Sequence, residues 1–259
     1  MREVASEEVL PRFRNLSEND ISEKSTGELV TVADERAEAA LEAGLGALVP
    51  GSVVIGEELT ARDPEVLDAM DNHDGPMWIV DPVDGTQNFA DGKTCFAMIV
   101  AYVREGVTRA GWILEPYSDQ MVTAELGQGA WEGDAALEVS NTSEIGQFRG
   151  SLNKRLRNKL LELRGTSSAT ILAKMIRYAC VGAEYADLAR GKLDFAYYTG
   201  SLKPWDHAAG VLIHKEAGGF SAYVDTMTPY VPAPPHRGRA IIMAPREEAW
   251  YQLRDLTAV

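Results

Sequence analysis

The chain has few of the features that mark a secreted or membrane protein. Its 259 residues include only two cysteines, Cys95 and Cys180, which lie in apolar surroundings and are not spaced as a metal or redox pair. No apolar run is long enough to span a bilayer, and the amino terminus alternates acidic and basic residues instead of forming a secretory signal. We therefore expect buried free thiols, no membrane partner and a cytoplasmic location.

Positive charge is also scarce. The chain carries 25 Lys and Arg against 39 Asp and Glu, a net charge of -14 that opposes binding to a polyanion, so we expect no nucleic-acid partner. No low-complexity stretch or Pro/Gly/Ser-rich linker divides the sequence, and 45% of the residues are hydrophobic. This favours a single domain over residues 1–259, with approximate halves at 1–140 and 141–259.

The most informative segment lies at the end of an apolar run. Residues 78–80 (Trp-Ile-Val) predict the end of a buried strand, which Pro82 should stop because it fixes φ and lacks an amide donor. Asp81 and Asp84 would then project from a rigid end, where their mutual repulsion favours divalent cations between them. Oxygen ligands of this kind select Mg²⁺ or Mn²⁺. The alternative is an ordinary Asp-Pro, Asp-Gly turn after a strand.

The next two residues add donors to these acceptors. Gly85 permits a left-handed backbone, so the amides that follow it can point at an anion while the Thr86 hydroxyl lies beside them. The segment therefore offers groups for both a metal ion and a phosphate.

Two other apolar elements also end in carboxylates. A short strand over residues 52–56 leads to Glu57 and Glu58. Asp206 is placed at the start of an apolar helix, where its structural alternative is an N-cap role worth about 1 kcal/mol.

Taken together, these segments resemble the inositol monophosphatase family of Mg²⁺-dependent, lithium-sensitive phosphatases. The matching signatures, in order, are Lys24 to Asp34, Gly56-Glu57-Glu58, Asp81-Pro82-Val83-Asp84-Gly85-Thr86 with Asn88-Phe89, and Trp205-Asp206-His207-Ala208-Ala209-Gly210. Phosphatases that form an aspartyl-phosphate have one residue between their two Asp residues. Asp81 and Asp84 have two residues between them, so they do not fit that class.

The resemblance implies a role for each matching residue. Glu57, Asp81 and the Val83 carbonyl would hold a first Mg²⁺, Asp81, Asp84 and Asp206 a second, and Glu57 a weaker third through water. Asp34, Thr86 and Glu57 would be catalytic, with Asp34 and Thr86 orienting and deprotonating the water that attacks a phosphate monoester in line. The implied substrate-binding residues are Asp84, Gly85, Thr86, Glu184, Thr199 and Asp206. For Asp34 alone, the alternative is an acid that complements the first turn of a helix.

Two residues differ from the family's usual pattern, so the sequence does not identify the leaving group of the substrate. Thr199 stands where inositol-cleaving members commonly carry a Glu, and Glu184 stands where the family usually has a small residue. Glu184 would contact a polyol hydroxyl or an amine, or would be an acid at the surface of a helix start. The resemblance implies a small phosphorylated polyol or sugar such as inositol 1-phosphate. Alternatives are histidinol phosphate, fructose 1,6-bisphosphate and 3'-phosphoadenylate, or a regulatory binding member of the family without turnover.

Hydrophobic periodicity gives a coarse element order. We expect an opening helix bent at Pro11, a helix over 33–48 with Ala37, Leu41, Leu45 and Leu48 on one face, and helices near 184–190 and after Asp206. Strands are expected at 53–55, 77–80, 96–103, 110–114, 121–125 and 130–131, and near Phe220 and Ile241. These mixed elements indicate an α+β protein. The resemblance implies the layered αβαβα sandwich of the inositol monophosphatase and fructose-1,6-bisphosphatase type, a metal site between the halves, and a homodimer.

Overall fold

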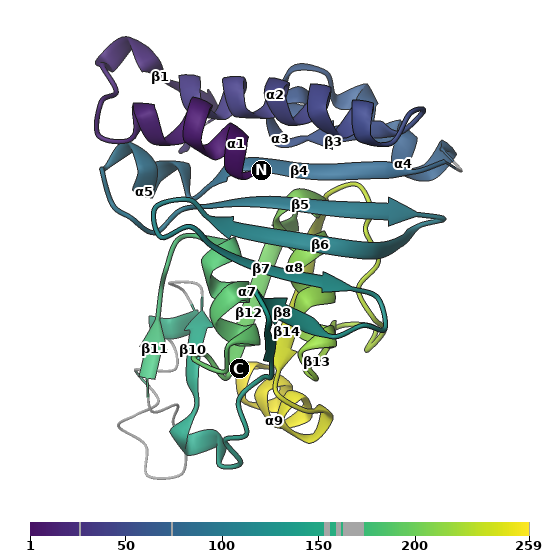
Figure 1. Ribbon diagram of the computed structural model, residues 1–259. Coiled ribbons are helices and arrows are strands. Elements are labelled where there is room, and N and C mark those ends of the chain that lie inside the picture. Colours follow the sequence, from purple (N-terminus) through teal and green to yellow (C-terminus); the bar gives the residue numbers. More distant parts are fainter. Residues whose placement is uncertain (26, 74, 153–155, 159–161, 163–173, 259) are drawn as a thin grey trace.

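The computed structural model describes residues 1–258 except 26, 74, 153–155, 159–161 and 163–173 (Figure 1). The α-helices are α1 (Arg2–Val4), α2 (Val32–Leu48), α3 (Glu57–Arg62), α4 (Ala69–Asn72), α5 (Thr86–Ala90), α7 (Val181–Ala189), α8 (Pro204–Glu216) and α9 (Glu247–Thr257). Shorter π and 3₁₀ segments are η1 (Ala5–Val9), η2 (Leu10–Arg12), η3 (Glu18–Asp20), η4 (Pro64–Asp68) and η5 (Ile145–Gln147). The opening helix is thus a run of α1, η1 and η2, and Pro11 lies in its 3₁₀ end.

Three sheets contain all the strands of the described residues. A small sheet pairs β1 (Ile21–Ser25) with β2 (Glu28–Thr31). The largest has the order β3 (Val53–Gly56), β4 (Met77–Asp84), β5 (Ala97–Arg104), β6 (Val107–Glu115), β7 (Gln120–Glu125), β8 (Ala130–Glu132), β9 (Ala135–Leu137). The third has the order β11 (Lys174–Ile176), β10 (Arg149–Leu152), β12 (Phe195–Leu202), β14 (His236–Ala244), β13 (Phe220–Tyr223). From β4 to β9 each strand pairs antiparallel with the next, so these strands form a meander.

The largest sheet is buried on both faces because its side chains alternate between two cores. On β4, Trp78 and Val80 face the amino-terminal helices, whereas Met77 and Ile79 face the rest of the molecule. The first face packs against α2 through Ala33, Ala37 and Leu41. This double burial explains why the strand is apolar without interruption.

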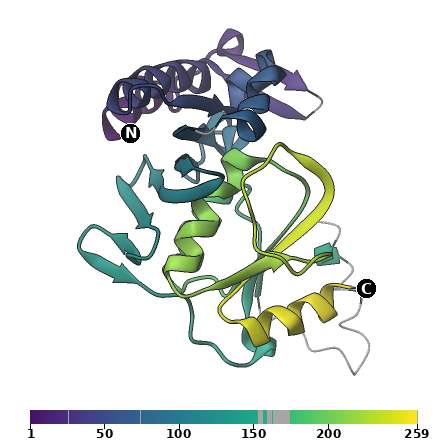
Figure 2. The same ribbon diagram turned by 90° about the vertical axis from the view of Figure 1, so that its right-hand side faces the viewer.

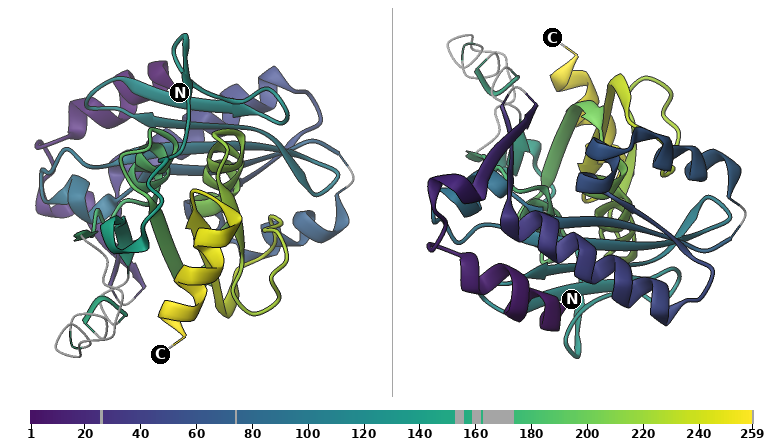
Figure 3. Two further views of the ribbon diagram at one scale, coloured as in Figure 1. Left: turned by 90° about the horizontal axis from the view of Figure 1, so that it is seen from below. Right: turned by 90° about the horizontal axis from the view of Figure 1, so that it is seen from above.

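The elements stack in five layers. Helix α2 and the opening helix cover the outer face of the largest sheet, as seen from above in Figure 3. Helices α7 and α8 lie between that sheet and the third sheet, and α9 covers the far face of the third sheet (Figure 2). On β14 the same alternation recurs, since Ile241 and Met243 belong to the central core and Ile242 and Ala244 to the core under α9. The fold is therefore the predicted αβαβα sandwich.

Strand β4 does not stop at Pro82, contrary to the prediction. It continues to Asp84 through a bulge, because Asp81 pairs with Ile99 and Asp84 with Ala97, so that one strand has an extra residue. Pro82 is tolerated there because the parallel partner β3 ends its pairing at Val80, and the missing amide leaves no gap in that ladder. The extra residue also puts Asp81 and Asp84 on the same face of the sheet. Their partners on β5, Ile99 and Ala97, both belong to the central core.

Two helix predictions also need correction. Leu48 is 70% exposed at the end of α2 and is not part of its apolar stripe, whereas Ala37 and Leu41 are buried. Helix α8 begins at Pro204 with Lys203 as its N-cap, so Asp206 is the third helical residue and not the cap. Proline suits the first helical position because the amide it lacks has no partner there. Within the described part of the chain, no helix is both long enough and apolar enough to cross a membrane.

Candidate metal centre and active site

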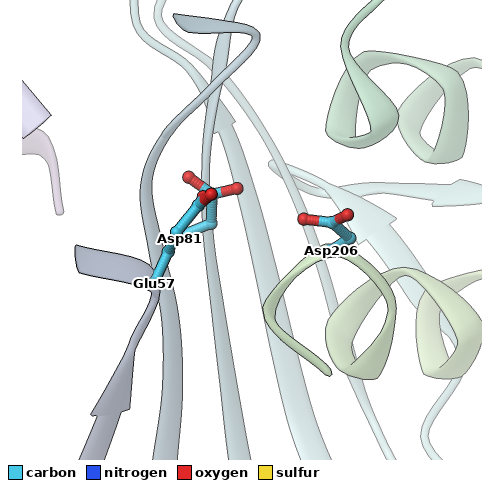
Figure 4. Close-up of side chains that lie close together, drawn as sticks. All are labelled: Glu57, Asp81 and Asp206. Atoms are coloured by element: carbon cyan, nitrogen blue, oxygen red, sulfur yellow. The ribbon is translucent and has the colours of Figure 1, made fainter. Parts of the chain in front are cut away.

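Three carboxylates from three elements meet at one point. Glu57 is the first residue of α3 directly after β3, Asp81 lies in β4, and Asp206 lies in the first turn of α8. One oxygen from each lies within 4.8 Å of the others. In Figure 4, Glu57 and Asp81 come from neighbouring segments and Asp206 faces them from its helix. Residues far apart in sequence therefore form one acidic cluster.

The cluster is unfavourable without a cation. Burial, and then the negative charge of Glu57, raise the pKa of Asp81 and of Asp206 well above the usual range. A divalent cation removes this cost by supplying the charge that the buried oxygens lack. Because every donor in the cluster is an oxygen, the residues fit Mg²⁺ or Mn²⁺ better than zinc.

Two lysines border the cluster. Lys24 Nζ lies 2.8 Å from Glu57 Oε1 and 2.7 Å from Glu58 Oε1. Lys203 Nζ lies 3.3 Å from the same oxygen of Glu57 and 3.0 Å from Glu28 Oε1. The Glu57 carboxylate thus lies between the acids Asp81 and Asp206 and the two lysine ammonium groups, which fix its position.

Asp34 and Thr86 are in direct contact. Thr86 Oγ1 lies 3.1 Å from Asp34 Oδ1 and 3.0 Å from the Val83 carbonyl oxygen, so its single proton has two acceptors. The other oxygen of Asp34 accepts the Thr31 amide at 2.8 Å in a capping box at the start of α2. Burial raises the pKa of Asp34 to about 7. The helix-start role and the proximity to Thr86 therefore coexist in one side chain.

Asp84 is oriented differently from the three clustered acids. Its Oδ2 accepts the Gly182 amide at 2.6 Å and the Cys180 thiol at 3.0 Å. It lies outside the three-residue cluster, although it lines the same cavity as Asp206. Burial raises the pKa of Asp84, while the Cys180 thiol and the Gly182 amide act in the opposite direction.

Gly85 has the predicted left-handed backbone. Its φ is +84°, and it caps the amino end of α5, whose first residue is Thr86. A Cβ at this position would lie 3.2 Å from the Cys180 Cβ and 3.2 Å from the Cys95 carbonyl oxygen. Glycine is thus required for both conformation and space.

A cavity of about 330 Å³ opens beside the cluster and contains the two residues that set this sequence apart. Its lining includes Asp84, Asp206, Glu184 and Thr199. Glu184 is 5% exposed, so the alternative of a surface acid is wrong. Its Oε1 accepts the Ser151 hydroxyl at 2.5 Å, and burial raises its pKa to about 7. Thr199 is exposed on β12 at the cavity wall.

Sequence reasoning missed Glu38. This buried side chain on α2 accepts the amides of Glu58 at 2.8 Å and Leu59 at 2.6 Å, and so holds the start of α3 behind Glu57. Gly56 leaves the necessary room, since a Cβ there would lie 2.1 Å from Glu38 Oε2. The signal was its position one helical turn after Asp34, which places both acids on one face of the helix.

Comparisons with known proteins found a matching family model and similar sequences and structures. Residues 1–251 match the model of the inositol monophosphatase family. An inositol-1-monophosphatase of Mesorhizobium japonicum is 32% identical over 82% of this chain and 79% of its own length. A fructose-1,6-bisphosphatase/inositol-1-monophosphatase of Thermotoga maritima is 32% identical over 77% of this chain and 74% of its own. A Nus factor SuhB of Vibrio cholerae is 28% identical over 83% and 79%. Among solved structures, an inositol monophosphatase of Thermotoga maritima superposes with a TM-score of 0.80 at 23% identity, covering 99% of this chain and 93% of that one.

Proposed function

Since the chain belongs to the inositol monophosphatase family, we propose that it is a Mg²⁺-dependent phosphatase of a small phosphorylated polyol or sugar, such as inositol 1-phosphate. The family is one of phosphoric monoester hydrolases that depend on metal. The observation that carries the proposal is the cluster of Glu57, Asp81 and Asp206 beside a cavity of about 330 Å³. A cavity of this size suits a small leaving group.

The metal-binding part of the proposal uses the acidic cluster and its neighbours. Two or three Mg²⁺ ions, or Mn²⁺ in their place, would be held by Glu57, Asp81, the Val83 carbonyl, Asp84 and Asp206. When bound, they supply positive charge to the phosphate and its leaving oxygen and acidify a water molecule. The raised pKa of Asp81 and Asp206 supports this assignment, because both acids gain from a nearby cation.

The chain's own residues would position and deprotonate the attacking water. The Thr86 hydroxyl would orient the water, and Asp34 would accept its proton through the 3.1 Å contact between the two side chains. A pKa of about 7 suits Asp34 to this task at neutral pH. The amides of Gly85 and Thr86 at the start of α5 would receive the phosphate oxygens.

The leaving group would lie in the cavity against Glu184 and Thr199. Because Thr199 offers a hydroxyl where a carboxylate is common, the acidic contact would come instead from Glu184, which reaches the cavity from α7. Fructose 1,6-bisphosphate is a second candidate, since a relative with 32% identity is named for both activities. Histidinol phosphate and 3'-phosphoadenylate remain alternative substrates, as predicted from the sequence.

Phosphate release tests the proposal. We would measure inorganic phosphate from inositol 1-phosphate, fructose 1,6-bisphosphate, histidinol phosphate and 3'-phosphoadenylate, each with Mg²⁺ and with EDTA. We expect Mg²⁺-dependent release led by one substrate and a loss of at least a thousandfold in Asp81→Asn. Asp119→Asn, the same chemical change at an exposed site, is the matched control and should keep full activity. Near-normal turnover in Asp81→Asn would remove the model of catalysis by clustered metals.

The same assay separates catalysis from a regulatory role. The alternative predicted from the sequence is a regulatory binding member of the family without turnover, and two similar proteins are named Nus factor SuhB. The acidic cluster supports turnover, and the absence of release from all four substrates would favour binding. The homodimer, the cytoplasmic location and the single domain over residues 1–259 stay predictions, of which light scattering after size exclusion tests the first.

A further inference from the structure

Two cysteines separated by 85 positions in sequence lie on adjoining loops. Cys95 is in the loop between α5 and β5, and Cys180 is the N-cap of α7. The Asn88 side-chain nitrogen holds the loops together, since it donates to the carbonyl oxygens of Cys95 and Tyr178, both at 2.9 Å. The Cys95 Sγ lies 3.9 Å from that Tyr178 oxygen, and its interaction with the Cys180 side chain lowers the pKa of the Cys95 thiol.

Both cysteines pack against the turn that carries Asp84. Gly85 follows Asp84 in this turn, and a Cβ added to it would lie 3.2 Å from the Cys180 Cβ and 3.2 Å from the Cys95 carbonyl oxygen. Cys180 is buried and donates its thiol proton to Asp84 Oδ2 at 3.0 Å. Cys95 is only partly buried, so a small molecule reaches it first.

We propose that Cys95 and Cys180 form a reversible disulfide, and that this pair is an oxidation site that controls the orientation of Asp84. Neither the sequence spacing nor the chemistry of phosphate hydrolysis requires such a pair. Its effect on metal binding rests on the proposed role of Asp84 as a ligand.

The co-reactant is a disulfide of a low-molecular-weight thiol, written RS–SR. The Cys95 thiol loses its proton, and its sulfur attacks one sulfur of RS–SR, which breaks that bond and releases RS⁻, protonated to RSH. The Cys180 sulfur then loses its proton and attacks the Cys95 sulfur, forming the internal disulfide and releasing the second RSH. Two protein thiols are thus oxidised by two electrons, while one RS–SR is reduced to two RSH.

The disulfide changes what Asp84 contacts. Its Oδ2 loses the Cys180 thiol donor and keeps the Gly182 amide, because a disulfide sulfur carries no proton. The bond of about 2.05 Å also draws the Cys180 sulfur toward Cys95. Since a group that orients a metal ligand commonly changes metal affinity 10–100-fold, we expect the oxidised protein to bind Mn²⁺ about tenfold more weakly.

The experiment uses the full chain and two readouts. Protein treated with glutathione disulfide is digested without reduction, and mass spectrometry looks for a linked peptide pair containing Cys95 and Cys180. Electron paramagnetic resonance of free Mn²⁺ then gives the affinity before oxidation, after it, and after dithiothreitol. Cys95→Ser is the matched control, because it cannot form the bond but keeps the contact between Cys180 and Asp84.

We expect the linked peptide, a tenfold loss of Mn²⁺ affinity and its recovery with dithiothreitol in the wild type, and no loss in Cys95→Ser. Absence of the linked peptide overturns the oxidation site. An equal loss of affinity in oxidised Cys95→Ser, or no loss in the linked wild type, overturns the control of Asp84. If the reduced wild type neither binds Mn²⁺ nor releases phosphate, the proposed function fails and the effect on metal binding fails with it, while the linked peptide still supports the oxidation site.

Discussion

Replacing Glu38 by alanine would remove the acceptor that fixes the start of α3. Its two carboxylate oxygens accept the amides of Glu58 and Leu59 at 2.8 Å and 2.6 Å. These are orphan amides of a helix terminus, which have no partner within the helix. Glu57 immediately precedes them, so the loss should affect both stability and the position of the carboxylate in the acidic cluster.

The magnitude follows from one favourable contribution and two that offset part of it. Each hydrogen bond to a charged acceptor contributes about 1.5–3 kcal/mol, so two give about 3–6 kcal/mol. Burial of the carboxylate, which raises the pKa of Glu38 to about 7, offsets part of this. Water entering the space also satisfies part of the lost bonding. We therefore expect Glu38→Ala to lower the free energy of unfolding by about 2–3 kcal/mol.

Urea denaturation and Mn²⁺ titration calorimetry at pH 8, where Glu38 is ionised, measure the two effects. We expect a loss of Mn²⁺ affinity of about tenfold, as for other groups that orient a ligand. Glu42→Ala makes the same change at an exposed position of α2 and should stay within about 0.5 kcal/mol of the wild type. If Glu38→Ala behaves like Glu42→Ala in both assays, Glu38 does not position α3 and the reasoning is refuted.

Two further predictions concern Gly85 and Glu184. Gly85→Ala should lower stability by about 2 kcal/mol and reduce phosphatase activity, because a Cβ adds steric contacts at 3.2 Å to an unfavourable positive φ. Gly127→Ala has a similar φ of +80° with nothing near its Cβ, so equal losses in the two variants would contradict a packing role. Burial raises the pKa of Glu184 from the usual 4.5 to about 7, so the folded protein binds more protons there and the resulting stability, complete below pH 4.5, is lost as pH rises through 7. Urea denaturation in EDTA at pH 5 and pH 8 should show a smaller fall in stability for Glu184→Gln than for the wild type, and an identical fall would count against the buried acid.

The sequence alone predicted several strands, the backbone of Gly85 and the acidic cluster. Strands β4 to β7 are apolar or alternating runs between turn residues, and the short connections from β5 to β6 and from β6 to β7 favour antiparallel pairing of these neighbours. Gly85 was expected to permit a left-handed backbone because glycine has no Cβ, and its φ is +84°. The cluster of Glu57, Asp81 and Asp206 followed from the resemblance, since each acid ends or begins an apolar element in a matching segment.

Other features depend on contacts that no local pattern contains. Pro82 stays in its strand only because β3 is too short to need its amide and β5 accepts a bulge. The start of α8 was misplaced because Pro204 was not recognised as its first residue, although that is a local signal. The juxtaposition of Cys95 and Cys180 requires the complete chain between them to fold, so their spacing in the sequence carries no trace of it.

The acidic cluster has a thermodynamic consequence for the whole molecule. Glu57 begins α3 directly after β3, Asp81 lies in β4 and Asp206 lies in α8, so the three are together only in the folded chain. A cation held by all three thus binds the folded form alone, and at a hundred times its dissociation constant adds about 2.7 kcal/mol to the free energy of unfolding. If the proposed Mg²⁺ is that cation, the free energy of unfolding rises with the concentration of free Mg²⁺, and a denaturation midpoint reports that concentration.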